Sequence, residues 1–111
     1  MINQITIGKV KKDKPNAENI YIGRGSPLGN PYPITANASR DEVCDRYDVY
    51  IRNVLQDTSS PQYKEMVRLL KMYQSGQSLH LQCFCAPLRC HGESIKSILE
   101  ATLKKMNQCT K

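Results

Sequence analysis

The sequence has no long apolar run, and its first residues lack a basic stretch followed by an apolar one. A membrane-spanning helix needs about 20 consecutive apolar residues, and a secretory signal needs the basic-then-apolar pattern. We therefore expect a cytoplasmic protein without membrane contact. In that compartment the five cysteines are expected to be reduced thiols, because the cytosol opposes disulfides and an odd number cannot pair completely.

Aromatic side chains are missing around the basic groups. The net charge of +6 at pH 7 favours anionic partners. Lysines gather at residues 9–14 and 104–105, but no aromatic residues alternate with them as a platform for stacked bases requires. The charge therefore favours a small anionic ligand or an acidic protein over nucleic acid.

The length of 111 residues suits one domain with a single core. We expect that domain to span residues 1–111, with disorder only at 1–2 and 107–111. Alternating apolar residues predict strands in NQITIGKV (residues 3–10), in NIYIG (19–23) and in SLHLQCFCA (78–86). Leu79, Leu81, Cys83 and Cys85 share one face of the last strand.

Three helices are predicted from start signals and apolar spacing. Ser39 and Glu42 form a capping box before a helix over about 40–56. Ser60 and Pro61 begin a second helix that ends at Gly76, and a third covers about 90–105. The expected order is β-β-α-α-β-α, a small α/β domain with a short, partly parallel sheet flanked by about three helices. The buried stripes contain Val43, Tyr47, Tyr50, Ile51 and Val54, then Met66, Leu69, Leu70 and Tyr73, then Ile95, Ile98, Leu99, Leu103 and Met106.

Two unusual segments follow predicted strands. GRGSPLGNP (residues 23–31) combines turn-forming glycines with Arg24, and CFCAPLRCHG (83–92) leads from the last strand into the last helix. Ligands of parallel sheets bind beyond the carboxyl ends of the strands, where helix amino ends attract anions. Arg24, Arg89 and the first helical turn at Gly92 therefore predict an anion site. The first segment is neither a Walker loop nor a dinucleotide fingerprint. Its prolines and glycines also suit a rigid connection, with Arg24 bonded to a structural carboxylate.

The pair of segments resembles a bacteriophage-rich family of small domains of unknown function, which carries elements like YIGRGSPLGNP and CFCAPLRCHG. The resemblance covers residues 3–103 and implies a viral or prophage source and a site where the two motifs meet. The second motif is also similar to a strand-to-helix segment of another uncharacterised bacterial family. The positions that the resemblance implicates are Tyr21, Gly23, Arg24, Gly29, Asn30, Pro31, Cys83, Cys85, Pro87, Cys90 and His91.

Three interpretations of the cysteines remain open. Cys83, Cys85, Cys90 and His91 give a zinc site the right number of ligands, but their spacing fits poorly, so we predict no metal and no cofactor. Cys90, beside Arg89 and His91 at a helix start, has the surroundings that favour a thiolate, and His91 could exchange a proton. The third interpretation makes Cys83 and Cys85 small buried apolar residues and makes His91 a cap on a carbonyl group.

The leading hypothesis is a protein that binds a nucleotide or nucleoside derivative between the two segments. The predicted ligand-binding residues are Tyr21, Gly23, Arg24, Gly29, Asn30, Pro31, Cys85, Pro87, Arg89 and Gly92. One alternative is an enzyme that uses Cys90 and His91 on such a ligand. The other is a phage protein that inhibits a host protein through its basic surface.

Overall fold

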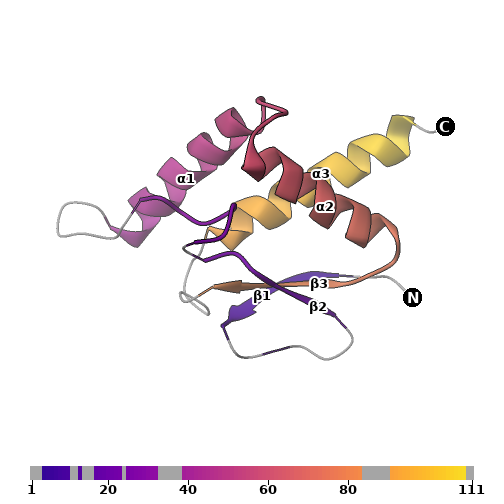
Figure 1. Ribbon diagram of the computed structural model, residues 1–111, viewed down its shortest axis with the longest axis horizontal. Helices are drawn as coiled ribbons and strands as arrows, with labels where there is room; N and C mark the ends of the chain where they lie inside the picture. The colour runs from indigo at the N-terminus through magenta and orange to yellow at the C-terminus, as the bar shows by residue number, and fades with distance from the viewer. Residues whose placement is uncertain are drawn as a thin grey trace.

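The computed structural model describes residues 4–10, 13, 17–23, 25–32, 39–83 and 91–109. Its elements follow the predicted order (Figure 1). They are β1 (Ile5–Lys9), β2 (Glu18–Tyr21), α1 (Arg40–Val54), α2 (Pro61–Gln74), β3 (Leu79–Cys83) and α3 (Gly92–Cys109). The α/β class and the β-β-α-α-β-α order are thus confirmed. No helix within the described ranges is long and apolar enough to cross a bilayer.

The three strands form one sheet in the order β1-β3-β2, and both pairings are parallel. Ile5 pairs with Leu79 on one side, and Glu18 pairs with Leu79 on the other. The last strand in the sequence is therefore the centre of the sheet, and all five of its residues are buried. Because the strands are parallel, their carboxyl ends lie at one edge.

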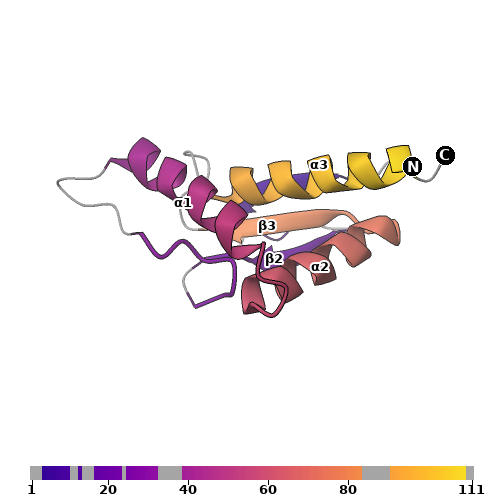
Figure 2. The ribbon, with the colours of Figure 1, turned by 90° about the horizontal axis from the view of Figure 1, so that it is seen from above.

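All three helices lie on the same side of the sheet, with α2 and α3 over its face and α1 largely beyond the carboxyl end of β3 (Figure 1). Seen from above, α3 and α2 flank β3 on opposite sides (Figure 2). The core between helices and sheet contains Leu79, Leu81 and Cys83 from β3, and Ile51, Met66, Leu69, Ile95 and Leu99 from the helices. The helical spacing correctly predicted these core residues, with Tyr50, Val54, Leu70, Tyr73 and Ile98 packed at their margins. Of the other predicted stripe residues in α3, Leu103 is half-buried and the side chain of Met106 lies outside the described residues.

The opposite face of the sheet is polar and carries none of the described helices. Strand register places Thr6, His80 and Asn19 in one row across this face. Thr6 Oγ1 lies 2.8 Å from His80 Nδ1, and Gln82, in the next row, donates from Nε2 to Asp13 Oδ1 at 2.7 Å. These bonds explain how His80 and Gln82 remain buried on a polar face.

The helix ends confirm the capping signals with small shifts in position. Ser39 Oγ accepts from the Glu42 amide at 3.3 Å, and Ser60 Oγ accepts from the Tyr63 amide at 3.1 Å. Gly76, after α2, has a φ of 101°, a conformation that favours glycine. The last helix begins at Gly92, two residues later than predicted, and the His91 carbonyl accepts from the Ser94 and Ile95 amides of its first turn. It continues to Cys109 instead of ending near 105.

Candidate functional site

The two sequence motifs meet at the carboxyl ends of β2 and β3. The Ile22 amide donates to the Gln82 carbonyl at 3.0 Å, which extends the pairing of the two strands by one residue. His91 Nε2 lies 2.6 Å from the Ile22 carbonyl oxygen, a contact between residues 69 positions apart in the sequence. The segment after β2 and the start of α3 are therefore held together directly.

His91 donates the hydrogen bond in this link. A carbonyl oxygen only accepts hydrogen bonds, so Nε2 carries a proton, and in the neutral form of the ring the lone pair is on Nδ1. Burial lowers the pKa of His91, while the bond to Ile22 opposes that shift. The ring also contacts Tyr47 edge-on, with centroids 4.9 Å apart. Proton exchange of the kind predicted for His91 would have to use Nδ1.

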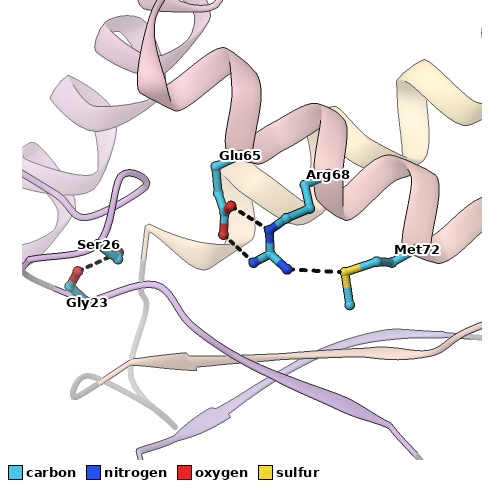
Figure 3. A network of polar contacts seen from close by, with 5 residues as sticks. All are labelled: Gly23, Ser26, Glu65, Arg68 and Met72. Carbon is cyan, nitrogen blue, oxygen red and sulfur yellow. Dashed lines mark hydrogen bonds and ion pairs between the residues drawn. The ribbon is translucent and has the colours of Figure 1, made fainter.

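The Gly-rich segment folds back on itself in two successive turns. The Gly23 carbonyl accepts from Ser26 Oγ at 2.7 Å (Figure 3). It also accepts from the Ser26 amide at 3.1 Å, and the Gly29 amide donates to the Ser26 carbonyl at 3.0 Å. A Cβ atom at Gly29 would lie 2.5 Å from the Gly23 carbonyl oxygen. Glycine at position 29 is therefore required by the close approach of the backbone.

Tyr47 on α1 anchors the same segment from the other side. Its hydroxyl donates to the Leu28 carbonyl at 2.7 Å, and both side chains are buried. The sequence marked Tyr47 only as part of a buried helical stripe. The available signal was its hydroxyl, because a buried tyrosine O–H needs an acceptor. Which acceptor it finds depends on the path of a distant loop.

Asn30 and Pro31 lie at the far end of the segment. Asn30 Oδ1 accepts from the Tyr32 amide at 2.8 Å, a local turn that Asn favours. Pro31 is exposed. The Asn30 side chain therefore shapes the backbone that leads to Tyr32, whose ring packs edge-on against Tyr50 with centroids 6.0 Å apart.

Tyr21 adds an exposed ring at this edge. It is 39% exposed and belongs to the helix-free face of the sheet, in the same row as Gln82. A Cβ atom at Gly23 would lie 2.5 Å from Tyr21 Oη, so the ring lies directly over the Gly23 backbone. The absence of a side chain at Gly23 allows this arrangement.

Arg68 on α2 is occupied by its own helix. Its Nε and Nη2 donate to both oxygens of Glu65 at 2.7 and 2.6 Å, and Nη1 points to the Met72 sulfur at 3.5 Å (Figure 3). The pKa of Arg68 is raised, first by the hydrogen bond to Glu65. This cation is neutralised by its pairing and is a poor candidate for an anion ligand.

Of the predicted residues that the structure describes, Tyr21, Gly23 and Gly29 lie against one another, and His91, followed by Gly92, is joined to them through Ile22. Asn30 and Pro31 lie further along the segment, toward Tyr32. Gly92 is buried at the first position of α3. Other predicted positions lie outside the described residues, and these are Arg24, Cys85, Pro87, Arg89 and Cys90.

Cys83 lies in the apolar core, 1% exposed, on the sheet face that the helices cover. This position matches the interpretation of Cys83 as a small buried apolar residue, and the bond from His91 to the Ile22 carbonyl matches the same interpretation of His91. Among the described residues no three His, Cys, Asp or Glu side chains are grouped as metal ligands would be. Cys85 and Cys90, the partners of Cys83 in the zinc interpretation, fall outside those residues.

Fold and site together define a small parallel α/β domain in which a Gly-rich loop and a Cys-His helix start are joined at the carboxyl edge of the sheet. The chain belongs to the DUF4326 family, a domain of unknown function, which it matches over residues 5–101. The family match spans both motifs. No curated protein and no solved structure matches the chain.

Proposed function

We propose that this domain binds a small anionic ligand, a nucleotide or nucleoside derivative, at the carboxyl edge of its sheet. The observation that carries the proposal is the hydrogen bond from His91 Nε2 to the Ile22 carbonyl, 2.6 Å long. It joins the loop after β2 to the first turn of α3, the place where parallel α/β sheets bind their ligands.

The start of α3 supplies part of the attraction for an anion. The aligned peptide dipoles of a helix add partial positive charge at its amino end. Burial keeps His91 neutral, so His91 adds no full charge. The proposal therefore assigns the full positive charge to Arg24, which follows Gly23 directly, with Arg89 as a second donor.

Tyr21 suits the nucleoside part of the ligand. Its ring is 39% exposed and rests on the Gly23 backbone, so one face of the ring is supported by the protein. Nucleobases stack on such aromatic rings with a stabilisation of about 1–3 kcal/mol. The turns around Ser26 and Gly29 hold the loop beside this ring.

The biological setting is part of the same proposal. The resemblance of both motifs to a bacteriophage-rich family supports a phage or prophage source. The cytoplasm, of the host cell in that case, would provide both the nucleotides and the reducing conditions that keep the cysteines as thiols.

Calorimetric titration with inorganic phosphate, nucleosides and nucleotides tests the proposal. Nucleotides are expected to bind and to raise the melting temperature. Arg24→Ala should weaken nucleotide binding by about 1.5–3 kcal/mol, the range for hydrogen bonds to charged groups. Tyr21→Ala should weaken the binding of nucleosides and nucleotides but leave the binding of phosphate unchanged. Lys64→Ala, at an exposed site on α2, should leave the binding of all three kinds of compound unchanged.

Two results would overturn the proposal: no binding of any of these compounds at millimolar concentration, or nucleotide binding that Arg24→Ala leaves unchanged. Product formation that stops in Cys90→Ser would instead favour the enzyme alternative. If the protein binds none of these compounds but binds a host protein, the inhibitor alternative is favoured.

A further inference from the structure

The outer side of β1 is an edge of the sheet whose backbone groups pair with no other strand among the described residues. In the described sheet β1 pairs only with β3. The Gln4 carbonyl and the Val10 amide point toward β3, where they bond to Leu79 and Cys83. Alternate residues of a parallel strand direct their N–H and C=O groups to opposite sides, so those of Ile5, Ile7 and Lys9 face outward. Such an edge is a template for another strand.

A hollow of about 580 Å³ runs between this edge and α3. Ile7, which is half-buried, lies at its β1 side, and its α3 side is lined by Glu93, Lys96, Glu100 and Lys104, with the small residues Ser97 and Ala101 between them. Within the described part of the chain, Lys96, Glu100 and Lys104 form no ion pair, since the ion pairs found there are Arg52–Asp48 and Arg68–Glu65.

The charged residues along α3 are ordered so that two antiparallel copies of the helix place opposite charges side by side. If a second α3 runs antiparallel beside the first, Glu93 of one copy lies opposite Lys104 of the other, and Lys96 lies opposite Glu100. The midpoint of Glu93 and Lys104 falls between Ile98 and Leu99, and that of Lys96 and Glu100 falls at Ile98, so one register of the two helices serves both pairs to within half a residue. Ile7 borders the same hollow as these four residues. One twofold axis near Ile7 could therefore pair two β1 edges and two α3 helices together.

We propose that two copies of this chain associate through β1 and α3 about a twofold axis, forming a continuous six-stranded sheet. The two β1 strands pair antiparallel, with Ile7 beside Ile7 and Ile5 beside Lys9 of the other copy. The outward backbone groups then bond to each other, the two Ile7 side chains exclude water, and each charged pair occurs twice. A twofold interface buries the same patch on both copies and leaves neither edge open.

The β2 edge fits a second copy less well. That strand has four residues, and its last residue is Tyr21 of the candidate ligand site. The β1 interface leaves Tyr21 exposed, because β1 and β2 are the two outer strands on opposite sides of β3. The inference is thus independent of the proposed ligand.

Charge reversal at the centre of α3 gives a direct test by sedimentation and light scattering. The wild-type chain is expected to be dimeric at about 100 µM. In Lys96→Glu two carboxylates face each other across the axis at each contact, and in Glu100→Lys two ammonium groups do so. Each single variant should raise the dissociation constant about tenfold or more, because two attractive contacts become repulsive.

An equimolar mixture of the two variants should form heterodimers with nearly the wild-type affinity, because every contact again joins opposite charges. Lys96 and Glu100 also neighbour each other on one helix, but that interaction is the same in homodimers and heterodimers. Lys96→Glu lowers the net charge from +6 to +4, and Glu100→Lys raises it to +8. Both variants remain cationic, so net charge does not draw them together.

Lys64→Glu on α2 is the matched control, since it changes the net charge by the same amount at an exposed site away from the hollow. It should dimerise as the wild type does, and circular dichroism should show native folding in all variants. Amide exchange at Ile5, Ile7 and Lys9 should slow with rising protein concentration. A chain that stays monomeric to about 300 µM overturns the proposal. So does a dimer that Lys96→Glu and Glu100→Lys leave intact, or an assembly larger than two.

Discussion

Replacing Tyr47 by Phe tests how firmly the Gly-rich loop is attached to the helices. The Tyr47 side chain is fully buried, and its hydroxyl donates to the Leu28 carbonyl at 2.7 Å. Phenylalanine keeps the ring and its contact with His91 but leaves the carbonyl without that donor. Loss of one partner of a buried hydrogen bond costs about 1–3 kcal/mol, so the free energy of unfolding should fall by about this amount.

The decrease is measurable by urea denaturation and by melting temperature. For a domain of this size, each 1 kcal/mol lowers the melting temperature by about 4–8 °C. Tyr50→Phe is the matched control one turn further along α1. Its hydroxyl accepts a longer bond from Gln62 Nε2, 3.3 Å, and the side chain is only half-buried. We expect Tyr50→Phe to cost less than about 0.5 kcal/mol.

The structural reasoning would be refuted if Tyr47→Phe and Tyr50→Phe were equally stable with equal denaturant slopes. A second measurement separates local from global effects. Amide exchange of residues 25–30 should accelerate in Tyr47→Phe more than exchange in β3, because the lost bond holds the loop and not the centre of the sheet. Uniform acceleration would show that the loop and the core open together.

Two further predictions concern the same edge of the sheet. Burial lowers the pKa of His91 below the ordinary value of 6.5, so as the pH falls the unfolded chain binds a proton before the folded chain does. The free energy of unfolding should therefore decrease as the pH falls through 6.5 and level off below the folded-state pKa. Denaturation at several pH values should show this decrease in the wild type but not in His91→Gln. Equal dependence of the unfolding free energy on pH in the two proteins would contradict the prediction. Gly29→Ala should destabilise the protein by about 1–3 kcal/mol, because its Cβ would lie 2.5 Å from the Gly23 carbonyl oxygen; an alanine variant as stable as the wild type would mean that the turn can open at little cost.

The sequence determined the local structure of this protein well. Apolar spacing identified the three strands and three helices, because a buried face requires a period near 2 in a strand and near 3.6 in a helix. Ser39, Ser60 and Pro61 marked helix starts and Gly76 marked a helix end, since these residues satisfy or omit backbone groups within a few positions of themselves. The sequence also placed both motifs after strands, and the structure joins them through His91 and Ile22.

Only the tertiary structure decided the contacts that form the candidate site. The order β1-β3-β2 and the covering of one sheet face depend on how the elements pack together. The bonds from His91 to Ile22 and from Tyr47 to Leu28 join residues 69 and 19 positions apart. A side chain that needs an acceptor is visible in the sequence, but the carbonyl it finds is not, because every residue offers the same backbone oxygen. The path of the folded chain selects one of them.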